Sequence, residues 1–209
     1  MYLSKYRIDI RNPYVRVNLQ NPQEMHRSIM SAFRELQGEE QRSASKILYR
    51  LFYTDKETTL FLSSVEKPNS ETLAKRGLVP QGSIEIERMK NLFQEGTYWK
   101  FDLLAMPSKK ISGEGKNSKR VYLTQSTERM NWLQKKGLQN GFTPISVQEF
   151  EEQKHILNRN QVRFGFTATR FLGVLKVENN DMFWNAYTRG VGPEKAYGLG
   201  MLLVKKLEV

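Results

Sequence analysis

The order in which alternating and helical segments follow one another constrains the fold of this chain more than any other feature. Apolar and polar side chains alternate over residues 5–11, which is the two-residue period of a strand. Residues 21–24 (Asn-Pro-Gln-Glu) then predict a helix start, because asparagine caps helices, proline suits the first helical position and an early acid favours a capping box. Apolar residues recur at helical spacing up to Gly38, where we expect the helix to end.

Two strands that fold back on each other are expected after this helix. Residues 47–53 alternate, residues 54–57 form a polar turn, and residues 59–65 return as the partner strand. A short helix around residues 70–75 and a strand over 83–87 complete the half. The resulting order, βαββαβ, is that of a ferredoxin-like domain.

The second half repeats this plan in architecture and not in sequence. Its expected elements are a strand over 99–105, a polar loop over 106–118, a short extended segment over 120–123, a helix over 126–136 stopped by Gly137, a strand over 162–168 with its hairpin partner over 171–177, a helix from Asp181 to Gly190, and a strand over 200–207. The sequence thus predicts an α+β protein with two tandem ferredoxin-like (RRM-like) domains, over residues 1–92 and 93–209.

Charge and cysteine usage narrow the classes of function. With 33 basic and 22 acidic residues among 209, the formal net charge is +11 at pH 7, which favours a polyanion such as nucleic acid, although some basic proteins are merely soluble. The absence of cysteine excludes disulfides, thiol nucleophiles and zinc fingers, and indicates a reducing, cytoplasmic compartment. No apolar run has the length of a membrane span or of a secretory signal, so we expect no membrane contact.

Two histidines are the candidates for imidazole chemistry. Neither His26 nor His155 lies in a carboxylate cluster or an HExxH pattern, so we expect no metal site and no cofactor. His155 lies in a charged stretch and is expected to be a solvated loop residue. His26 lies in the first turns of the predicted helix, at the edge of its apolar stripe, and Arg27 and Arg34 lie on the adjoining polar face.

The position of His26 suits phosphate chemistry. A helix N-terminus carries partial positive charge and free N–H groups, and both favour a phosphate. An imidazole there, beside guanidinium groups, could serve acid–base chemistry at a phosphodiester. The alternative is a surface histidine on an amphipathic helix.

A glycine-rich segment follows the last predicted helix. It contains Gly190, Gly192, Gly198 and Gly200, together with Lys195. The segment matches neither the GxxxxGK[ST] loop nor the GxGxxG turn, which disfavours a nucleotide cofactor. The glycines would let the backbone approach another group closely, and the alternative is a tight connection between helix and strand.

Basic side chains gather in two further regions, where they could follow a nucleic-acid backbone or span an RNA groove. An ordinary solvated face is the alternative for each of them. The candidate RNA-binding residues are Arg34, Lys109, Lys110, Lys119, Arg159, Arg163, Arg170 and Lys195.

Motifs spread over nearly the whole chain carry a family resemblance. They are MYLSKYRID at the start, MHR at 25–27, FDLLAMP at 101–107, RVYL at 120–123 with WLQK at 132–135, FLGVL at 171–175, and GVGPEKAYGLGMLLV at 190–204. Together these segments resemble the CasE family, the CRISPR repeat endoribonuclease of the type I-E Cascade complex. The C-terminal segment is the most specific of the matches.

The resemblance implies a fold, an activity and partners. It implies two ferredoxin-like domains and metal-free cleavage of a CRISPR repeat transcript at the 3′ base of a short RNA hairpin. In that family the ribose 2′-hydroxyl attacks the adjacent phosphate, leaving a 2′,3′-cyclic phosphate and a 5′-hydroxyl, and the product is carried into Cascade with its other subunits. His26 falls on the catalytic histidine, with proton transfer as its expected role, and Arg27 is the candidate for holding the scissile phosphate.

Two positions depart from the family pattern. Gln23 stands where relatives often carry a tyrosine, and an amide can orient a hydroxyl but cannot transfer a proton in the same way. Either Gln23 positions the substrate or another residue partners His26. A lysine of some relatives is Ser31 here, so that contact is not carried over.

Two other functions stay open from the sequence. One is a catalytically weak or inactive subunit that holds a repeat hairpin, which Gln23 motivates. The other is a general RNA-recognition protein that uses aromatic side chains on its sheets. The second is disfavoured because residues 163–166 (Arg-Phe-Gly-Phe) match an RNP1 motif only in part.

Overall fold

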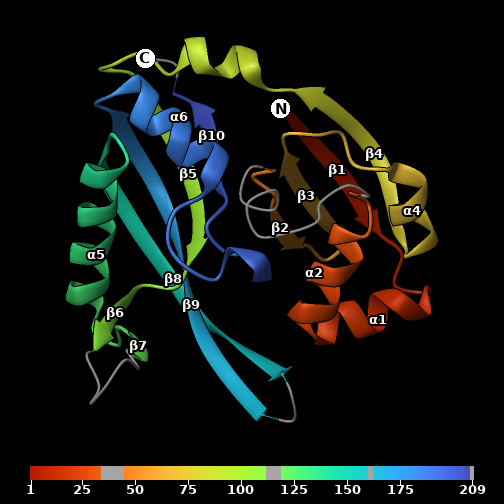
Figure 1. Ribbon diagram of the computed structural model, residues 1–209. Coiled ribbons are helices and arrows are strands. Elements are labelled where there is room, and N and C mark those ends of the chain that lie inside the picture. Colours follow the sequence, from red (N-terminus) through yellow and green to blue (C-terminus); the bar gives the residue numbers. More distant parts are fainter. Residues whose placement is uncertain (34–44, 112–118, 160–161, 208–209) are drawn as a thin grey trace.

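The structure, a computed structural model, describes residues 1–33, 45–111, 119–159 and 162–207 (Figure 1). For residues 119, 151–159 and 162–164 it describes the backbone alone. The described helices and strands form two successive halves, each built on an antiparallel four-stranded sheet. This arrangement confirms the expected α+β fold of two tandem ferredoxin-like domains.

The sheet of the N-terminal half has the strand order β2-β3-β1-β4, which is the order that βαββαβ connectivity produces. The elements of this half are β1 (Tyr2–Ile8), α1 (Pro13–Gln20), α2 (Pro22–Met30), β2 (Leu48–Tyr53), β3 (Thr58–Ser64), α4 (Ser70–Lys75), β4 (Leu78–Glu85) and the 3-10 helix η1 (Glu87–Leu92). The hairpin predicted over residues 47–65 is confirmed as β2 and β3.

Several boundaries in this half differ from the expected ones. β1 ends at Ile8, so Ile10, expected on the core face, is 62% exposed. Helix α1 was not expected, although Asn12 caps it with the same Asn-Pro pair that begins α2. β4 starts at Leu78, ahead of the expected residue 83.

Helix α2 ends at Met30, earlier than the predicted end at Gly38. Ser31 is its C-cap, and the chain then tightens because Ala32 N–H bonds to the carbonyl of Ile29 and Phe33 N–H to that of Met30. Phe33 nevertheless stays in the core, as its helical spacing predicted. Gly38 lies outside the described residues.

The sheet of the C-terminal half has the order β10-β5-β9-β8, so the four strands that follow the ferredoxin plan repeat the topology of the first sheet. The elements of this half are β5 (Tyr98–Ala105), β6 (Ser108–Ile111), β7 (Lys119–Tyr122), α5 (Ser126–Gln139), β8 (Phe142–Arg159), β9 (Val162–Val177), α6 (Asn180–Arg189), the 3-10 helix η2 (Lys195–Tyr197) and β10 (Leu202–Lys206). The strand predicted over 99–105 and the helix that ends at Gly190 are both present.

The expected hairpin between 162–168 and 171–177 is wrong. These residues form one unbroken strand, β9, whose partner is β8. The pairing of β8 shifts register between Pro144 and Ser146 and again between Phe150 and Gln153, so its apolar residues change face along the strand. Because of these two bulges, the sequence of β8 does not show the strict alternation of apolar and polar residues that predicts a strand. His155, expected in a loop, lies in β8 opposite Phe166.

Two further expectations in this half are corrected. The predicted loop over 106–118 contains β6, which pairs with β7. Helix α5 continues through Gly137 to Gln139. Gly137 is buried, and a Cβ there would come within 2.5 Å of the Phe142 carbonyl oxygen, so this glycine serves close packing and does not end the helix.

The C-terminal sheet has two buried faces. Phe101 and Leu103 of β5 join the core against the helices of this half. Because side chains alternate along a strand, Asp102 and Leu104 point to the opposite face. Leu104 packs there with Phe166 in a separate cluster, and that face meets the N-terminal half.

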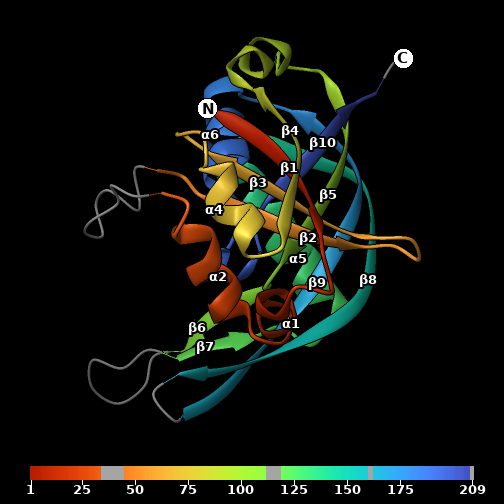
Figure 2. The same cartoon turned by 90° about the vertical axis from the view of Figure 1, so that its right-hand side faces the viewer.

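Figures 1 and 2 show the far ends of β8 and β9 extending beyond their sheet on the side where α1 and α2 lie. None of the described helices is long and apolar enough to cross a membrane. The division into domains 1–92 and 93–209 stays a prediction, and the position falls at the end of η1.

Candidate functional site

Helix α2 is fixed at its start by caps and along its length by packing. The Asn21 side chain accepts a hydrogen bond of 3.0 Å from the backbone N–H of Gln23, and Pro22 occupies the first helical position. Met25 and Ile29 are buried in the N-terminal core, 1% and 0% exposed. The helix therefore presents its remaining side chains from a rigid position.

The three candidate catalytic side chains project from neighbouring positions on the surface of this helix. Gln23, His26 and Arg27 are spaced i, i+3 and i+4, which places them on one face. His26 and Gln23 are half-buried, and Arg27 is exposed. Arg27 Nη1 donates to Glu24 Oε1 at 2.5 Å. Because an exposed ion pair contributes only about 0–1 kcal/mol, this guanidinium can exchange its carboxylate for a phosphate at little cost.

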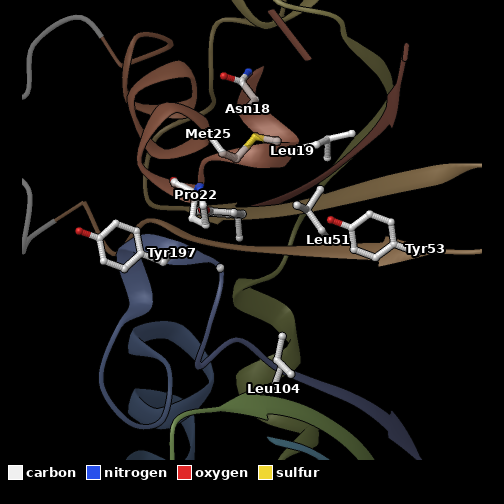
Figure 3. A pocket seen from close by; sticks show the side chains of 10 residues that line it. Asn18, Leu19, Pro22, Met25, Leu51, Tyr53, Leu104 and Tyr197 are labelled. Atoms are coloured by element: carbon white, nitrogen blue, oxygen red, sulfur yellow. Dashed lines mark hydrogen bonds between the residues drawn. The ribbon is translucent and has the colours of Figure 1, made fainter. Parts of the chain in front are cut away.

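The glycine-rich segment reaches from the C-terminal half to the start of α2. An apolar pocket between them is lined by Pro22 and Met25 on one side and by Leu104, Tyr197 and Gly198 on the other (Figure 3). The segment thus brings η2 beside the helix that carries His26, which its sequence distance of about 170 residues would not suggest.

Close approach explains the glycine at position 198. Its φ is 84°, in the left-handed region, and a Cβ there would come within 2.9 Å of the Tyr49 ring. Tyr49 is itself buried, and its hydroxyl donates to the Pro22 carbonyl oxygen at 3.5 Å. Gly198 and Tyr49 therefore set the distance between the glycine-rich segment and α2.

The segment is closed on itself and tied to the second sheet. Val191 N–H donates to the carbonyl of Gly200 at 2.8 Å, and Gly200 N–H donates to the carbonyl of Leu104 at 2.7 Å. Gly190, Gly192 and Gly200 have φ values of 75°, 91° and 81°. The sequence prediction of a backbone that approaches other groups closely fits this geometry.

Lys195 lies on the same segment but lines a different hollow. There it joins Arg120 of β7 and Lys136 of α5, beside Gly190 and Gly192. We call this hollow the cationic pocket. The sequence placed Arg120 only in the basic region around residues 109–120 and did not single out Lys136, and no spacing signal could have joined residues 120, 136 and 195.

The remaining candidate RNA-binding residues occupy three places. Lys109 and Lys110 are exposed on β6, and Lys109 Nζ lies 3.2 Å from Glu128 Oε1. The backbones of Arg159 and Arg163 flank the end of the β8–β9 hairpin, where Asn158 pairs with Arg163. Lys119 begins β7, and Arg34 lies outside the described residues.

Arg170 is placed apart from that group. It lies in the middle of β9, where its Nη2 donates to Asp102 Oδ2 at 2.5 Å and its Nε contacts both carboxylate oxygens at 3.1 Å. The role of Arg170 in RNA binding stays a prediction, because the structure gives it a carboxylate partner between the two sheets. Asp102 itself is a residue that sequence reasoning missed.

Metal ligation is not indicated by the described side chains. Among them, no group of three or more histidine, aspartate or glutamate residues is arranged to hold a metal ion. On one face of α2 the described site offers an imidazole, an amide and a guanidinium.

Comparisons with known proteins extend over nearly the whole chain. It is 26% identical to the CRISPR-associated endoribonuclease Cse3 of Thermus thermophilus, with 98% of this chain and 99% of that protein covered. A solved structure of Thermus thermophilus Cse3 bound to an RNA representing a pre-cleavage complex matches with a TM-score of 0.82 and 25% identity, covering 98% of each chain.

A second relative shares the fold. The crystal structure of Cas6e from Escherichia coli K-12 matches with a TM-score of 0.75 at 22% identity, covering 99% of this chain and all of that one. The family model described as CRISPR associated protein matches residues 1–206. The resemblance found in the sequence is confirmed, and this chain belongs to that family of CRISPR-associated proteins.

Proposed function

We propose that this protein is a metal-independent endoribonuclease that binds the stem-loop of CRISPR repeat RNA and cleaves it at the 3′ base of the stem. The observation that carries the proposal is helix α2, on which Gln23, His26 and Arg27 are spaced i, i+3 and i+4 and which η2 of the glycine-rich segment contacts. The name and RNA complexes of the Thermus thermophilus relative support the same activity.

The proposed reaction needs no group beyond the RNA and this helix face. The ribose 2′-oxygen forms a bond to the adjacent phosphorus, the bond from phosphorus to the 5′-oxygen breaks, and a 2′,3′-cyclic phosphate and a 5′-hydroxyl result. One proton leaves the 2′-hydroxyl and one arrives at the 5′-oxygen. His26 serves one of these two transfers, because imidazole exchanges protons near neutral pH.

The neighbouring side chains take the other tasks. Arg27 holds the phosphate oxygens, whose negative charge grows as the new bond forms. Gln23 orients the 2′-hydroxyl through its amide. The N-terminus of α2 adds favourable partial charge to the same region.

Retention of the product as a Cascade subunit is part of the proposal. The matches to chains of CRISPR RNA-guided surveillance complexes cover 99% of this chain and support it through the fold. The absence of cysteine and the charge of +11 are in keeping with a cytoplasmic, RNA-binding subunit.

The test is a cleavage assay on a labelled repeat hairpin with EDTA present. It compares wild type with His26→Ala, and the full ribose with a 2′-deoxy substitution at the scissile nucleotide. We expect cutting only by wild type and only on the full ribose. Equal cleavage by His26→Ala would remove this histidine from the reaction, and cleavage of the 2′-deoxy substrate would exclude 2′-hydroxyl attack.

A catalytically weak hairpin-binding subunit is the second candidate, which Gln23 favours. In that case wild type binds the hairpin and leaves it intact over long incubation. Gln23→Tyr then tests the cause, because it restores a side chain that can exchange a proton. Cleavage gained by Gln23→Tyr, with unchanged hairpin affinity, would assign the weakness to this position.

A further inference from the structure

The cationic pocket gathers positive side chains from three parts of the chain. Arg120 comes from β7, Lys136 from the last turn of α5, and Lys195 from η2 in the glycine-rich segment. No aspartate or glutamate is among the described residues that line it. Lys136 Nζ donates to the neutral amide oxygen of Gln139 at 3.0 Å.

Several described arginines and lysines elsewhere in this half differ from those of the cationic pocket, because each forms an ion pair with a carboxylate. Arg129 faces Glu149 at 2.6 Å, Arg170 faces Asp102 at 2.5 Å, and Lys109 faces Glu128 at 3.2 Å. At those sites a carboxylate compensates each cation. The three cations of the pocket instead face one another across a polar hollow, which an anion would complete.

The electrostatics of the two lysines agree with this geometry. Burial lowers the pKa of Lys195, and the charges of Arg189 and Lys136 lower it further. Burial also lowers the pKa of Lys136, with smaller contributions from Arg120 and Lys135. An anion between the two lysines would favour their charged forms and so raise their pKa values again.

The backbone holds Lys195 in place at some conformational cost. Glu194, directly before it, has a φ of 59°, a left-handed conformation that is uncommon for a residue with a side chain. Gly198 closes the 3-10 helix with a φ of 84°. Unfavourable backbone conformations persist where the surrounding structure requires them, and they are concentrated at binding sites.

We propose that the cationic pocket binds one backbone phosphate of the repeat RNA, distinct from the phosphate that is cleaved. This assignment rests on the proposed function, because that function makes RNA the source of the phosphate. A phosphate fits the site, because its several charged oxygens can accept hydrogen bonds from a guanidinium and two ammonium groups at once.

The placement gives this phosphate contact a positioning effect. The glycine-rich segment lines the cationic pocket with Lys195 and the apolar pocket beside α2 with Tyr197 and Gly198. An RNA anchored at Lys195 is therefore held at a fixed distance from the helix that carries His26. The pocket would align the hairpin before the chemical step.

The experiment measures binding of a non-cleavable hairpin, with a 2′-deoxy substitution at the scissile nucleotide. Wild type is compared with Lys195→Gln, Lys136→Gln and the control Lys75→Gln, an exposed lysine of α4. We expect each pocket variant to weaken binding by about tenfold and to reduce the slope of log K against log salt by about one. Lys75→Gln should match wild type.

Ethylation of single phosphates locates the contact. Ethylation at one particular phosphate should weaken binding of wild type and should no longer weaken binding of Lys195→Gln. If affinity, salt slope and ethylation pattern of both pocket variants equal those of Lys75→Gln, the proposal is wrong. If inorganic phosphate raises the Tm of wild type alone while RNA binding is unaffected by the variants, the pocket binds free anions and the RNA assignment is overturned.

The proposed catalysis is judged separately in the same preparations. Cleavage by wild type with unchanged binding by the pocket variants would reject only the phosphate site. Loss of the single ethylation contact in Lys195→Gln, together with an intact hairpin after incubation with wild type, would support the phosphate site and reject the catalysis.

Discussion

Arg50 of β2 donates from Nη2 to Asp102 Oδ1 of β5 at 3.0 Å, and this bond joins the two sheets. Arg170 binds the same carboxylate from β9, so one acid serves two arginines. Arg50 is only 3% exposed, and burial lowers its pKa to about 10, which leaves it charged at neutral pH. Its Nε and Nη1 have no hydrogen-bond acceptor among the described residues.

We expect Asp102→Asn to lower the free energy of unfolding strongly and Arg50→Met to change it little or to raise it. Asp102→Asn leaves two arginines without their carboxylate and should lower the free energy of unfolding by about 3–5 kcal/mol. Arg50→Met removes a cation with two unbonded donors, while Arg170 keeps Asp102 compensated, so its effect should stay within about 1 kcal/mol or stabilise. Urea unfolding of both variants checks this, and a larger loss in Arg50→Met would contradict it.

Variants of the α2 face that carries His26 and Arg27 should change the rate of cleavage more than the affinity for RNA. His26→Ala should reduce the single-turnover cleavage rate by about 10²–10⁴-fold with little change in hairpin affinity. Arg27→Ala should cost about 2.7–4 kcal/mol in the barrier if the guanidinium holds the charge of the transition state. Arg16→Ala, an exposed arginine on α1, is the matched control and should cleave at the wild-type rate.

The ion pair between Glu149 and Arg129 should make the stability of the protein depend on pH. Hydrogen bonds from Arg129 hold the pKa of Glu149 below its ordinary value. A carboxylate with a lowered folded pKa stabilises the protein above its unfolded pKa, about 4.3, and the contribution is lost as pH falls through the folded value.

Glu149→Gln should therefore lower the free energy of unfolding at pH 7 by about 1.5–3 kcal/mol. The difference from wild type should shrink toward zero below about pH 4. Glu66→Gln, at an exposed position, should show no such difference at either pH. A gap between wild type and Glu149→Gln that is independent of pH would show that the ion pair is not its cause.

Two glycines separate backbone strain from close packing. Gly198→Ala combines a φ of 84° with a Cβ placed 2.9 Å from the Tyr49 ring, whereas Gly96→Ala combines a φ of 83° with open space. Strain alone costs about 1–3 kcal/mol in each, so the two variants should lose similar stability from that source. Only Gly198→Ala should also lose cleavage activity in the folded protein, because it displaces η2 from α2. Equal activity of the two folded variants would argue against this spacing role.

Local chemistry explains which parts of the fold the sequence predicted. The Asn21 cap, the turn over 54–57 and Gly190 at the end of α6 act within a few residues, so they could be found without a structure. Strand β8 was missed because its two bulges interrupt the alternation that identifies strands. Bulges depend on the partner strand, which the sequence of β8 does not specify.

The same distinction applies to the candidate site. His26 could be singled out because two local signals lie close to it in the sequence. One is the helix cap at Asn21, and the other is the family motif at residues 25–27. The Arg50–Asp102 bond and the group formed by Arg120, Lys136 and Lys195 arise from the packing of distant segments. A tertiary contact of this kind has no period or spacing along the chain.

The pairing of β10 with β5 has a consequence for the order in which the protein acquires activity during synthesis. Leu202 pairs with Leu103, and the Gly200 N–H bond to Leu104 lies beside that pair. A chain is made from its N-terminus, so α2 exists long before residues 190–206 leave the ribosome. The glycine-rich segment can reach α2 only after this last strand docks, and a nascent chain would therefore expose His26 without a complete site for RNA.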